Sequence, residues 1–262
     1  WEVIDIQQTF PYVQVTARHT TTGETRTVRG KYLIGADGAN SIVRNTIGSD
    51  WHPRTGAFWG LDHGIDWLGD EEQYEEFNVL LAGKDYGWPF IYERGRPNLK
   101  SDPEPTTGLT WKEYAARTEF PRAGIEPHSA PMNFLFYKGA QFPAACRNSA
   151  FLTLHGSWNR ADPVGYKVVL VKFNSAGEPV GVQDFLTGFL VKNDRGQFGR
   201  PCGLAVLPDG SLLVGDDSGG VIYRVSYTGC TRGDDSSWWK LRHDAWQDPD
   251  QSADRHDHGW RR

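Results

Sequence analysis

Long hydrophobic runs, a basic surplus and a metal-type cysteine pattern are all absent from this chain of 262 residues. No run approaches the roughly 18 apolar residues that a membrane-spanning helix needs. The formal net charge is −5, which argues against a nucleic-acid groove, because such a groove needs a broad basic face. The three cysteines (Cys146, Cys202 and Cys230) are odd in number and have no metal-site spacing, so they tell little about compartment.

The first residues also lack a signal-peptide pattern, because no charged stretch leads into an apolar one after Trp1. We therefore expect no signal peptide here and interpret the chain as a fragment. Thirty glycines, fifteen prolines and 13% aromatic residues are present instead. This composition favours a turn-rich β protein over a helical one.

Two distant stretches of the chain repeat one pattern. The first runs from Arg44 to Asp62 and the second from Arg200 to Asp216. In each, an arginine precedes a Gly-led apolar strand, a Pro/Gly turn and a second apolar strand that ends on aspartate. A third copy starts at His128, which takes the place of the arginine. Repeated strand pairs indicate a propeller or solenoid. Since equivalent positions of a closed propeller face one rim, we expect these basic residues to converge on an axial, anionic ligand.

Three other segments have their own patterns. Alternating residues in 1–47 predict strands. A short helix is predicted at 110–117, where Thr110 and Glu113 have the spacing of a capping box. Residues 230–262 have no periodicity, and we predict that this tail is irregular or disordered.

The run Gly35-Ala-Asp37-Gly-Ala-Asn-Ser41, followed by Val43-Arg44, resembles a segment of the FAD-dependent aromatic hydroxylases (monooxygenases). In that family the aspartate that matches Asp37 contacts the ribityl part of FAD. The Gly-x-Gly-x-x-Gly that would carry the pyrophosphate at a helix N-terminus does not occur upstream. We therefore interpret residues 1–47 as a structural remnant of such an enzyme, and FAD binding stays an alternative.

From about Val43 to Tyr227 the sequence resembles the PQQ-dependent sugar (aldose, sorbosone or pyranose) dehydrogenases. Several motifs in family order carry the resemblance, among them Arg44–Gly48, Asp62–Asp70, Asp85–Pro89, His128–Pro131, His155–Arg160, Gly199–Val206 and Asp209–Asp217. The resemblance implies a six-bladed β-propeller that holds PQQ and Ca²⁺ on its axis.

The expected fold is accordingly all-β, with a partial six-bladed propeller preceded by a short β-meander. We predict three parts: a monooxygenase-like fragment at 1–43, the C-terminal part of a propeller at 44–229, and the tail at 230–262. The two resemblances meet at Val43-Arg44, so we infer that the chain joins two pieces of different ancestry.

The resemblance also implies a ligand with three carboxylates, which guanidinium groups bind well. The predicted PQQ contacts are Arg44, Asn45, His155, Trp158, Asn159, Arg160, Arg200 and Asp217. Calcium prefers hard oxygen ligands, and the predicted metal site is the acidic loop with Asp62, Gly64, Asp66 and Asp70, largely through backbone oxygens. Structural roles stay open: surface arginines, a buried His155 bonded to backbone, a turn aspartate at 217, and a solvated acidic loop.

The implied reaction is PQQ- and calcium-dependent oxidation of a sugar or aldose hydroxyl, or of an aldehyde, to a lactone or acid. An external acceptor would take the electrons, and the parent enzyme would be periplasmic or extracellular. Histidine is the usual general base near neutral pH. The family's base lies in a part of the propeller that monooxygenase-like sequence replaces here, and neither His63 nor His128 matches it. We therefore expect an incomplete copy. The alternatives are a non-catalytic propeller that binds a carbohydrate or protein, and an FAD-dependent monooxygenase fragment.

Overall fold

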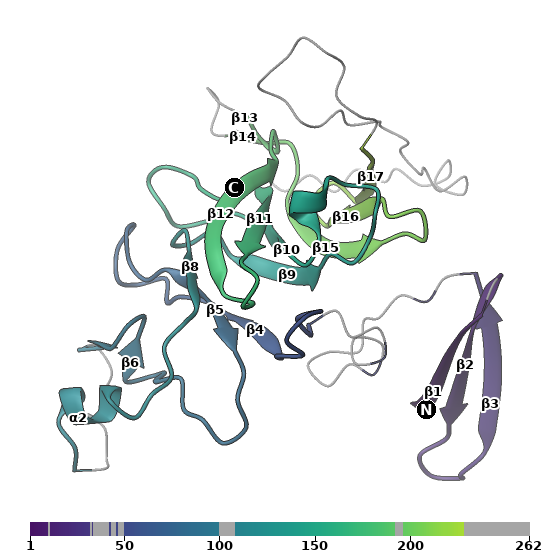
Figure 1. The fold of residues 1–262 in the computed structure, drawn as a ribbon, viewed down its shortest axis with the longest axis horizontal. Coiled ribbons are helices and arrows are strands. Elements are labelled where there is room, and N and C mark those ends of the chain that lie inside the picture. The colour runs from purple at the N-terminus through teal and green to yellow at the C-terminus, as the bar shows by residue number, and fades with distance from the viewer. Residues whose placement is uncertain are drawn as a thin grey trace, which may run out of the picture. The chain divides into compact units, whose positions relative to one another are not determined.

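The structure, a computed structural model, describes residues 1–9, 11–31, 33, 42, 46, 50–99, 108–191 and 196–227 (Figure 1). The chain divides into two compact units, Trp1–Trp51 and His52–Arg262. None of the helices in the described parts of the chain is long and apolar enough to cross a membrane.

The first unit contains one antiparallel sheet in the order β1–β2–β3. Its strands are β1 (Glu2–Thr9), β2 (Tyr12–Arg18) and β3 (Thr25–Gly30). None of the side chains in these three strands is fully buried. At one end Arg26 lies over the Trp1 ring, 4.8 Å from its centroid. The predicted meander is therefore present, but it does not enclose a core of its own.

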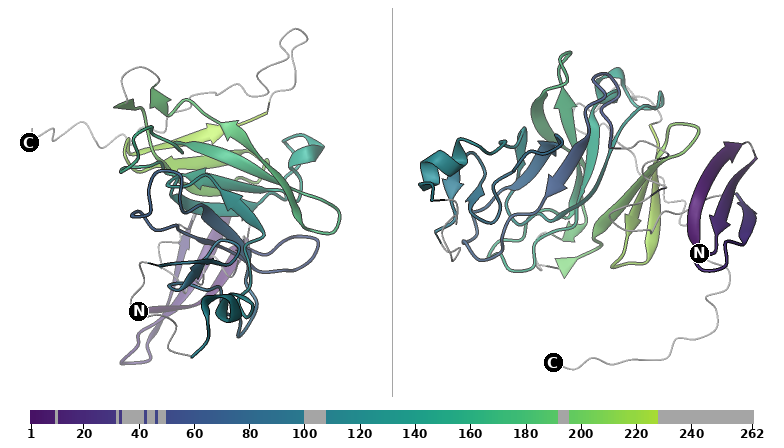
Figure 2. Two further views of the ribbon diagram at one scale, coloured as in Figure 1. Left: turned by 90° about the vertical axis from the view of Figure 1, so that its left-hand side faces the viewer. Right: turned by 90° about the horizontal axis from the view of Figure 1, so that it is seen from below.

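The second unit is built from three larger antiparallel sheets, which lie side by side in Figure 2. The first has the order β4 (Trp59–Asp62), β5 (Glu75–Val79), β8 (Ala123–Ile125). The second has the order β12 (Pro179–Leu186), β11 (Lys167–Phe173), β10 (Ala150–Leu154), β9 (Pro131–Phe136). The third has the order β15 (Pro201–Val206), β16 (Leu212–Asp216), β17 (Val221–Val225).

Smaller elements connect these sheets. Two short hairpins are formed by β6 (Ile91–Tyr92) with β7 (Arg96–Pro97) and by β13 (Leu190–Val191) with β14 (Gly196–Gln197). A 3₁₀ turn spans Ala144–Cys146. The predicted helix is confirmed as α2 (Trp111–Ala115), and its capping box is present: Thr110 accepts from the Glu113 backbone, and Glu113 bonds back to Thr110.

The middle sheet is buried on both faces, because the other two sheets pack against it. Side chains of a strand alternate between faces, and all five residues of β10 are buried. Leu152 belongs to the same buried cluster as Trp59 of β4. Its neighbour Phe151 belongs to the opposite cluster, with Leu212 of β16. A sheet with two apolar faces between two others is the packing expected of a propeller blade.

The predicted site residues lie at one end of the three sheets. The strands β4, β10 and β16 end at Asp62, Leu154 and Asp216, and the loops that follow them carry these residues. The all-β prediction with blade-like antiparallel sheets is confirmed. No sheet closes into a ring within the described ranges. The predicted boundary at 43/44, the Asp37 motif and the tail at 230–262 lie outside the described residues.

Replacing Phe151 with alanine should lower the free energy of unfolding of the second unit by about 3–5 kcal/mol, because it leaves a cavity where no side chain can collapse. Phe151 is 0% exposed. Urea unfolding followed by far-UV circular dichroism measures the change. Val180→Ala on the edge strand β12, where the side chain is exposed, is the control and should cost less than about 0.5 kcal/mol. Equal losses for both variants would contradict a core between the sheets.

Candidate functional site

The acidic loop after β4, residues 62–74, is attached to the next blade by a buried carboxylate. Glu75, the first residue of β5, is 3% exposed. One of its oxygens accepts the Gly64 amide (2.7 Å) and the other accepts the Ala130 amide (3.1 Å). Burial raises the pKa of Glu75, while these two amide bonds oppose the rise. Glu75 therefore holds the start of the loop against the segment that leads into β9.

Gly64 is required where the loop folds back on itself. A Cβ at this position would lie 2.6 Å from the Gln73 carbonyl oxygen. That separation is too short for any non-bonded carbon and oxygen. The close approach brings the two ends of the loop together, and the Gln73 side chain accepts the adjacent Ile65 amide at 3.3 Å.

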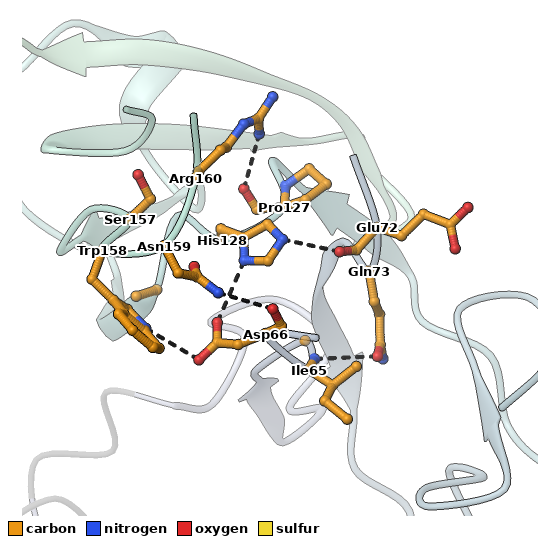
Figure 3. A network of polar contacts seen from close by, with 12 residues as sticks. Ile65, Asp66, Glu72, Gln73, Pro127, His128, Ser157, Trp158, Asn159 and Arg160 are labelled. Atoms are coloured by element: carbon orange, nitrogen blue, oxygen red, sulfur yellow. Dashed lines mark hydrogen bonds and ion pairs between the residues drawn. The ribbon is translucent and has the colours of Figure 1, made fainter. Parts of the chain in front are cut away.

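His128 binds the middle of the same loop at three points. Its Nε2 donates to the carbonyl oxygens of Gly69 (2.8 Å) and Glu72 (3.0 Å), and its Nδ1 lies 3.4 Å from the Asp66 carboxylate. Burial lowers the pKa of His128, but the bonds to Gly69, Asp66 and Glu72 outweigh it and leave the pKa above its ordinary value. Figure 3 shows the imidazole between Asp66 and the Glu72 backbone.

A second segment, which follows β10, reaches the loop from another side (Figure 3). The Trp158 indole N–H donates to the Asp66 carboxylate at 3.1 Å, and the Asn159 amide donates to the Asp66 carbonyl oxygen at 2.8 Å. The Arg160 guanidinium donates to Glu71 at 2.7 Å and to the Pro127 carbonyl at 3.2 Å. Asp66 is thus bound by His128, Trp158 and Asn159 together.

One atom of this network has no partner. The Asn159 Oδ1 is buried and accepts no hydrogen bond from the described residues. An orphaned buried acceptor costs free energy unless a donor or a cation satisfies it. It lies on the residue that already binds the Asp66 backbone, so a hard oxygen is available beside the acidic loop.

The predicted residues His155, Arg200 and Asp217 form a neighbouring cluster. His155 Nε2 lies 2.9 Å from the Asp217 carboxylate. The hydrogen bond from His155 lowers the pKa of Asp217, and burial opposes this. The Arg200 guanidinium donates to the carbonyl oxygens of His155 (3.1 Å) and Gly156 (2.5 Å) and lies over the Tyr166 ring. Arg200 is therefore anchored to the segment that continues to Trp158.

The structure places most of the predicted site residues on loops at one end of the sheets. Asp66 and Asp70 contact the segment 158–161, where the Asp70 carboxylate accepts the Ala161 amide at 2.9 Å. Asp62 and Gly64 begin the same loop. Arg44 and Asn45 lie outside the described residues. No group of three or more His, Cys, Asp or Glu side chains suited to a metal occurs in the part of the chain that the structure describes.

The sequence does not predict that Glu75 and His128 organise the loop. The repeat predicts that His128 faces an anionic ligand, whereas it contacts Asp66 and the carbonyl oxygens of Gly69 and Glu72. His128 begins the third copy of the repeated pattern, and that position was the available signal. For Glu75 no local signal exists, because its partners are Gly64 and Ala130, and Ala130 is 55 residues further along the chain.

Glu76, the residue after Glu75 on β5, is a second buried carboxylate. It is 3% exposed and lies opposite Asp62 in the β4–β5 ladder. Burial raises its pKa from 4.5 to about 7, although the Glu93 amide and the Asn78 side chain hydrogen-bond to it. Negative charge on Asp62 and Glu93 adds to the rise.

Parts of this chain are similar to known protein families. Residues 41–157 match the family model "Glucose / Sorbosone dehydrogenase", residues 101–228 match "TrAA12-like", and residues 1–61 match "FAD binding domain". The two resemblances inferred from the sequence are thereby confirmed. The matches to the FAD-binding and the glucose/sorbosone dehydrogenase models overlap at residues 41–61, so the junction at 43/44 stays a prediction.

Two curated relatives and one solved structure extend the comparison. An uncharacterized protein of Borreliella burgdorferi is 37% identical over 189 residues, covering 71% of this chain and 47% of that protein. A pyrroloquinoline quinone-dependent pyranose dehydrogenase of Coprinopsis cinerea is 33% identical over 119 residues, covering 38% of this chain and 15% of that protein. The chain thus spans half or less of these relatives. A calcium structure of Trichoderma reesei Carbohydrate-Active Enzymes family AA12 has a TM-score of 0.53 at 20% identity, covering 83% of this chain and 76% of that one. It shows a shared fold.

The buried Glu76 makes a pH-dependent contribution to stability. An acid whose folded pKa exceeds its unfolded pKa binds its proton more tightly when folded, so the contribution is full below the unfolded pKa and is lost as the pH rises through the folded pKa. We expect the wild type to lose about 3 kcal/mol relative to Glu76→Gln between about pH 4.5 and 7.5. Urea unfolding in EGTA at both pH values measures this. Parallel losses in the two proteins would contradict a proton on Glu76.

Proposed function

We propose that this chain forms part of a PQQ- and Ca²⁺-binding propeller that serves the oxidation of a sugar hydroxyl or aldehyde to a lactone or acid. One observation carries the proposal: His128 and Asn159 hold the acidic loop in a defined shape. This loop lies at the end of the sheets where the strands β4, β10 and β16 terminate. The glucose/sorbosone dehydrogenase match covers this loop and His128. The pyranose dehydrogenase relative supports PQQ and a sugar substrate for the whole protein.

The donor set of the loop fits a hard cation. Calcium takes six to eight oxygens from carboxylates, amides and backbone carbonyls. Asp66 and Asp70 offer carboxylates, and the orphaned Asn159 Oδ1 offers an amide oxygen that otherwise lacks a partner. The carbonyls that accept from His128 each keep a second lone pair. We assign Asp62, Gly64, Asp66 and Asp70 to this site, with Asn159 as a further ligand candidate.

The neighbouring cluster fits an anionic quinone. Arg200 uses Nε and Nη2 on backbone carbonyls, and Nη1 has no recorded partner among the described residues. It can therefore meet one carboxylate of PQQ by a single contact, with charge held in place by Tyr166. His155, Trp158, Asn159, Arg160 and Asp217 are assigned to the same cofactor surface, together with Arg44 and Asn45.

When bound, PQQ would supply a two-electron acceptor and Ca²⁺ a Lewis acid. The chain's own residues contribute charge and orientation. Asp217 accepts from His155 Nε2, which fixes the tautomer and leaves Nδ1 as a proton acceptor. We assign the catalytic base of the family reaction to no residue of this chain.

Two alternatives follow from particular observations. The match of residues 1–61 to an FAD-binding model favours a monooxygenase fragment that retains FAD. Neither His63 nor His128 matches the base of the family reaction, which favours a non-catalytic propeller that binds a ligand without turnover. For the parent protein we propose a periplasmic or extracellular location and an external electron acceptor.

A PQQ titration of the purified chain, with and without Ca²⁺ and followed by tryptophan fluorescence, tests the proposal. We expect saturable quenching that depends on Ca²⁺, because the cation would neutralise the acidic loop beneath an anionic ligand. Arg200→Ala should weaken PQQ binding about tenfold or more, the effect of losing a charge-assisted contact. Arg122→Ala, which removes an arginine paired with Glu178, is the matched control.

The outcomes distinguish the PQQ-binding propeller from the monooxygenase fragment and from the non-catalytic propeller. Quenching that is absent, or that is equal for Arg200→Ala and the control, would contradict the cofactor assignment. Saturable FAD binding without PQQ binding would favour the monooxygenase fragment. Binding of neither cofactor would favour the non-catalytic propeller.

A further inference from the structure

Two exposed indoles lie side by side on the loops of the candidate site. Trp67 follows Asp66 on the acidic loop, and Trp158 belongs to the segment after β10. They are 66% and 67% exposed. Their ring centroids are 6.1 Å apart and their planes meet at 83°. Indoles carry a large apolar area, so a contacting pair of which about two thirds is exposed marks an interaction surface.

The polar network holds the Trp158 ring in place, and the Trp67 ring lies against it. The Trp158 N–H is fixed on the Asp66 carboxylate at 3.1 Å, and the Asp66 backbone is fixed by Asn159 at 2.8 Å. Trp67 is bonded through the chain to that same residue. Ordering an aromatic side chain before the ligand arrives reduces the entropy lost on binding. The pair therefore forms a corner in which the Trp158 ring is anchored and the Trp67 ring meets it at 83°.

The surroundings of the corner restrict the ligand class. The carboxylates of Asp66, Asp70 and Glu71 lie on the same loop, and Glu71 is 80% exposed at its side chain. Such a rim repels phosphates and other anions, and it offers acceptors for hydroxyl groups. The Arg160 side chain is only 10% exposed, and its guanidinium already donates to Glu71 and to the Pro127 carbonyl, so the exposed rim is acidic. An uncharged ring with an apolar face and a hydroxylated edge satisfies both parts of this surface.

We propose that Trp67 and Trp158 form a stacking site for a neutral pyranose unit of an oligosaccharide. The substrate class rests on the proposed function, and the binding site rests on the geometry of the two indoles. A β-linked glucose ring suits the corner, because its equatorial hydroxyls leave axial C–H groups free on both faces. Under this proposal the exposed face of the Trp158 ring contacts sugar, while its N–H, bonded to Asp66, keeps the ring beside the proposed cofactor surface.

Isothermal titration with cellohexaose, without PQQ or Ca²⁺, tests the site directly. Trp67→Ala and Trp158→Ala should each weaken binding about tenfold, and Trp158→Phe should weaken it less, since it keeps a stacking face and loses only the N–H. Trp88→Ala is the matched control, because Trp88 is 48% exposed and makes no hydrogen bond to the acidic loop in the parts of the chain that the structure describes. Circular dichroism checks that each variant is folded.

Binding of a charged oligosaccharide and of PQQ provides two further tests of the stacking site. A hexagalacturonate, which has carboxylates on every ring, should bind at least about tenfold more weakly than cellohexaose. No cellohexaose binding by the wild type, or equal binding by the wild type and both alanine variants, would overturn the inference. Loss of PQQ affinity together with unchanged sugar affinity in Trp158→Ala would return this ring to the cofactor and would also overturn it.

The same samples keep the two proposals apart. PQQ binding without sugar binding would sink the stacking site and leave the cofactor proposal standing. Sugar binding that depends on both indoles, without PQQ binding, would support the stacking site and sink the cofactor proposal.

Discussion

The position of Asp66 is the constraint on which the candidate site depends. Its carboxylate and its carbonyl oxygen are bound by His128, Trp158 and Asn159, which come from two other segments of the chain. Without these bonds a loop of carboxylates would repel itself and sample many shapes. With them, the acidic groups, the orphaned Asn159 oxygen and the two indoles are held together. The proposed cation site, the proposed cofactor surface and the proposed saccharide site all depend on this one arrangement.

The core explains why the segments meet there. The middle sheet is buried on both faces, so the blades on either side are fixed against it, with Leu152 and Phe151 in opposite clusters. Thr153 adds a direct bond from β10 to the Cys202 carbonyl of β15 at 3.1 Å. Because this packing fixes the sheets relative to one another, it also fixes the positions of the loops at their ends. A rigid scaffold with functional loops at one end is the usual division of labour in β proteins.

Local patterns predicted much of this correctly, and contacts between blades were the part they could not reach. The strand pairs and the capping box at Thr110 follow from short-range signals and are confirmed. That the segments 62–70 and 155–160 form a cofactor and metal site follows from the resemblance and stays a prediction. That His128 binds Gly69, or that Glu75 binds Ala130, depends on how two sheets pack, and residues 55 or more positions apart leave no local trace of it. The anchoring of Arg200 on the backbone of His155 and Gly156 is of the same kind.

The most direct test of the account is luminescence of Tb³⁺, a calcium substitute with hard-oxygen preference, excited through tryptophan in protein stripped by EGTA. If the loop around Asp66 is a cation site next to Trp67 and Trp158, Tb³⁺ should give saturable sensitised emission that Ca²⁺ displaces. The emission should fall sharply in Asp66→Asn and persist in Asp209→Asn, whose carboxylate lies in the turn before β16. Emission that is absent, or that Asp66→Asn leaves unchanged, would contradict the central claim.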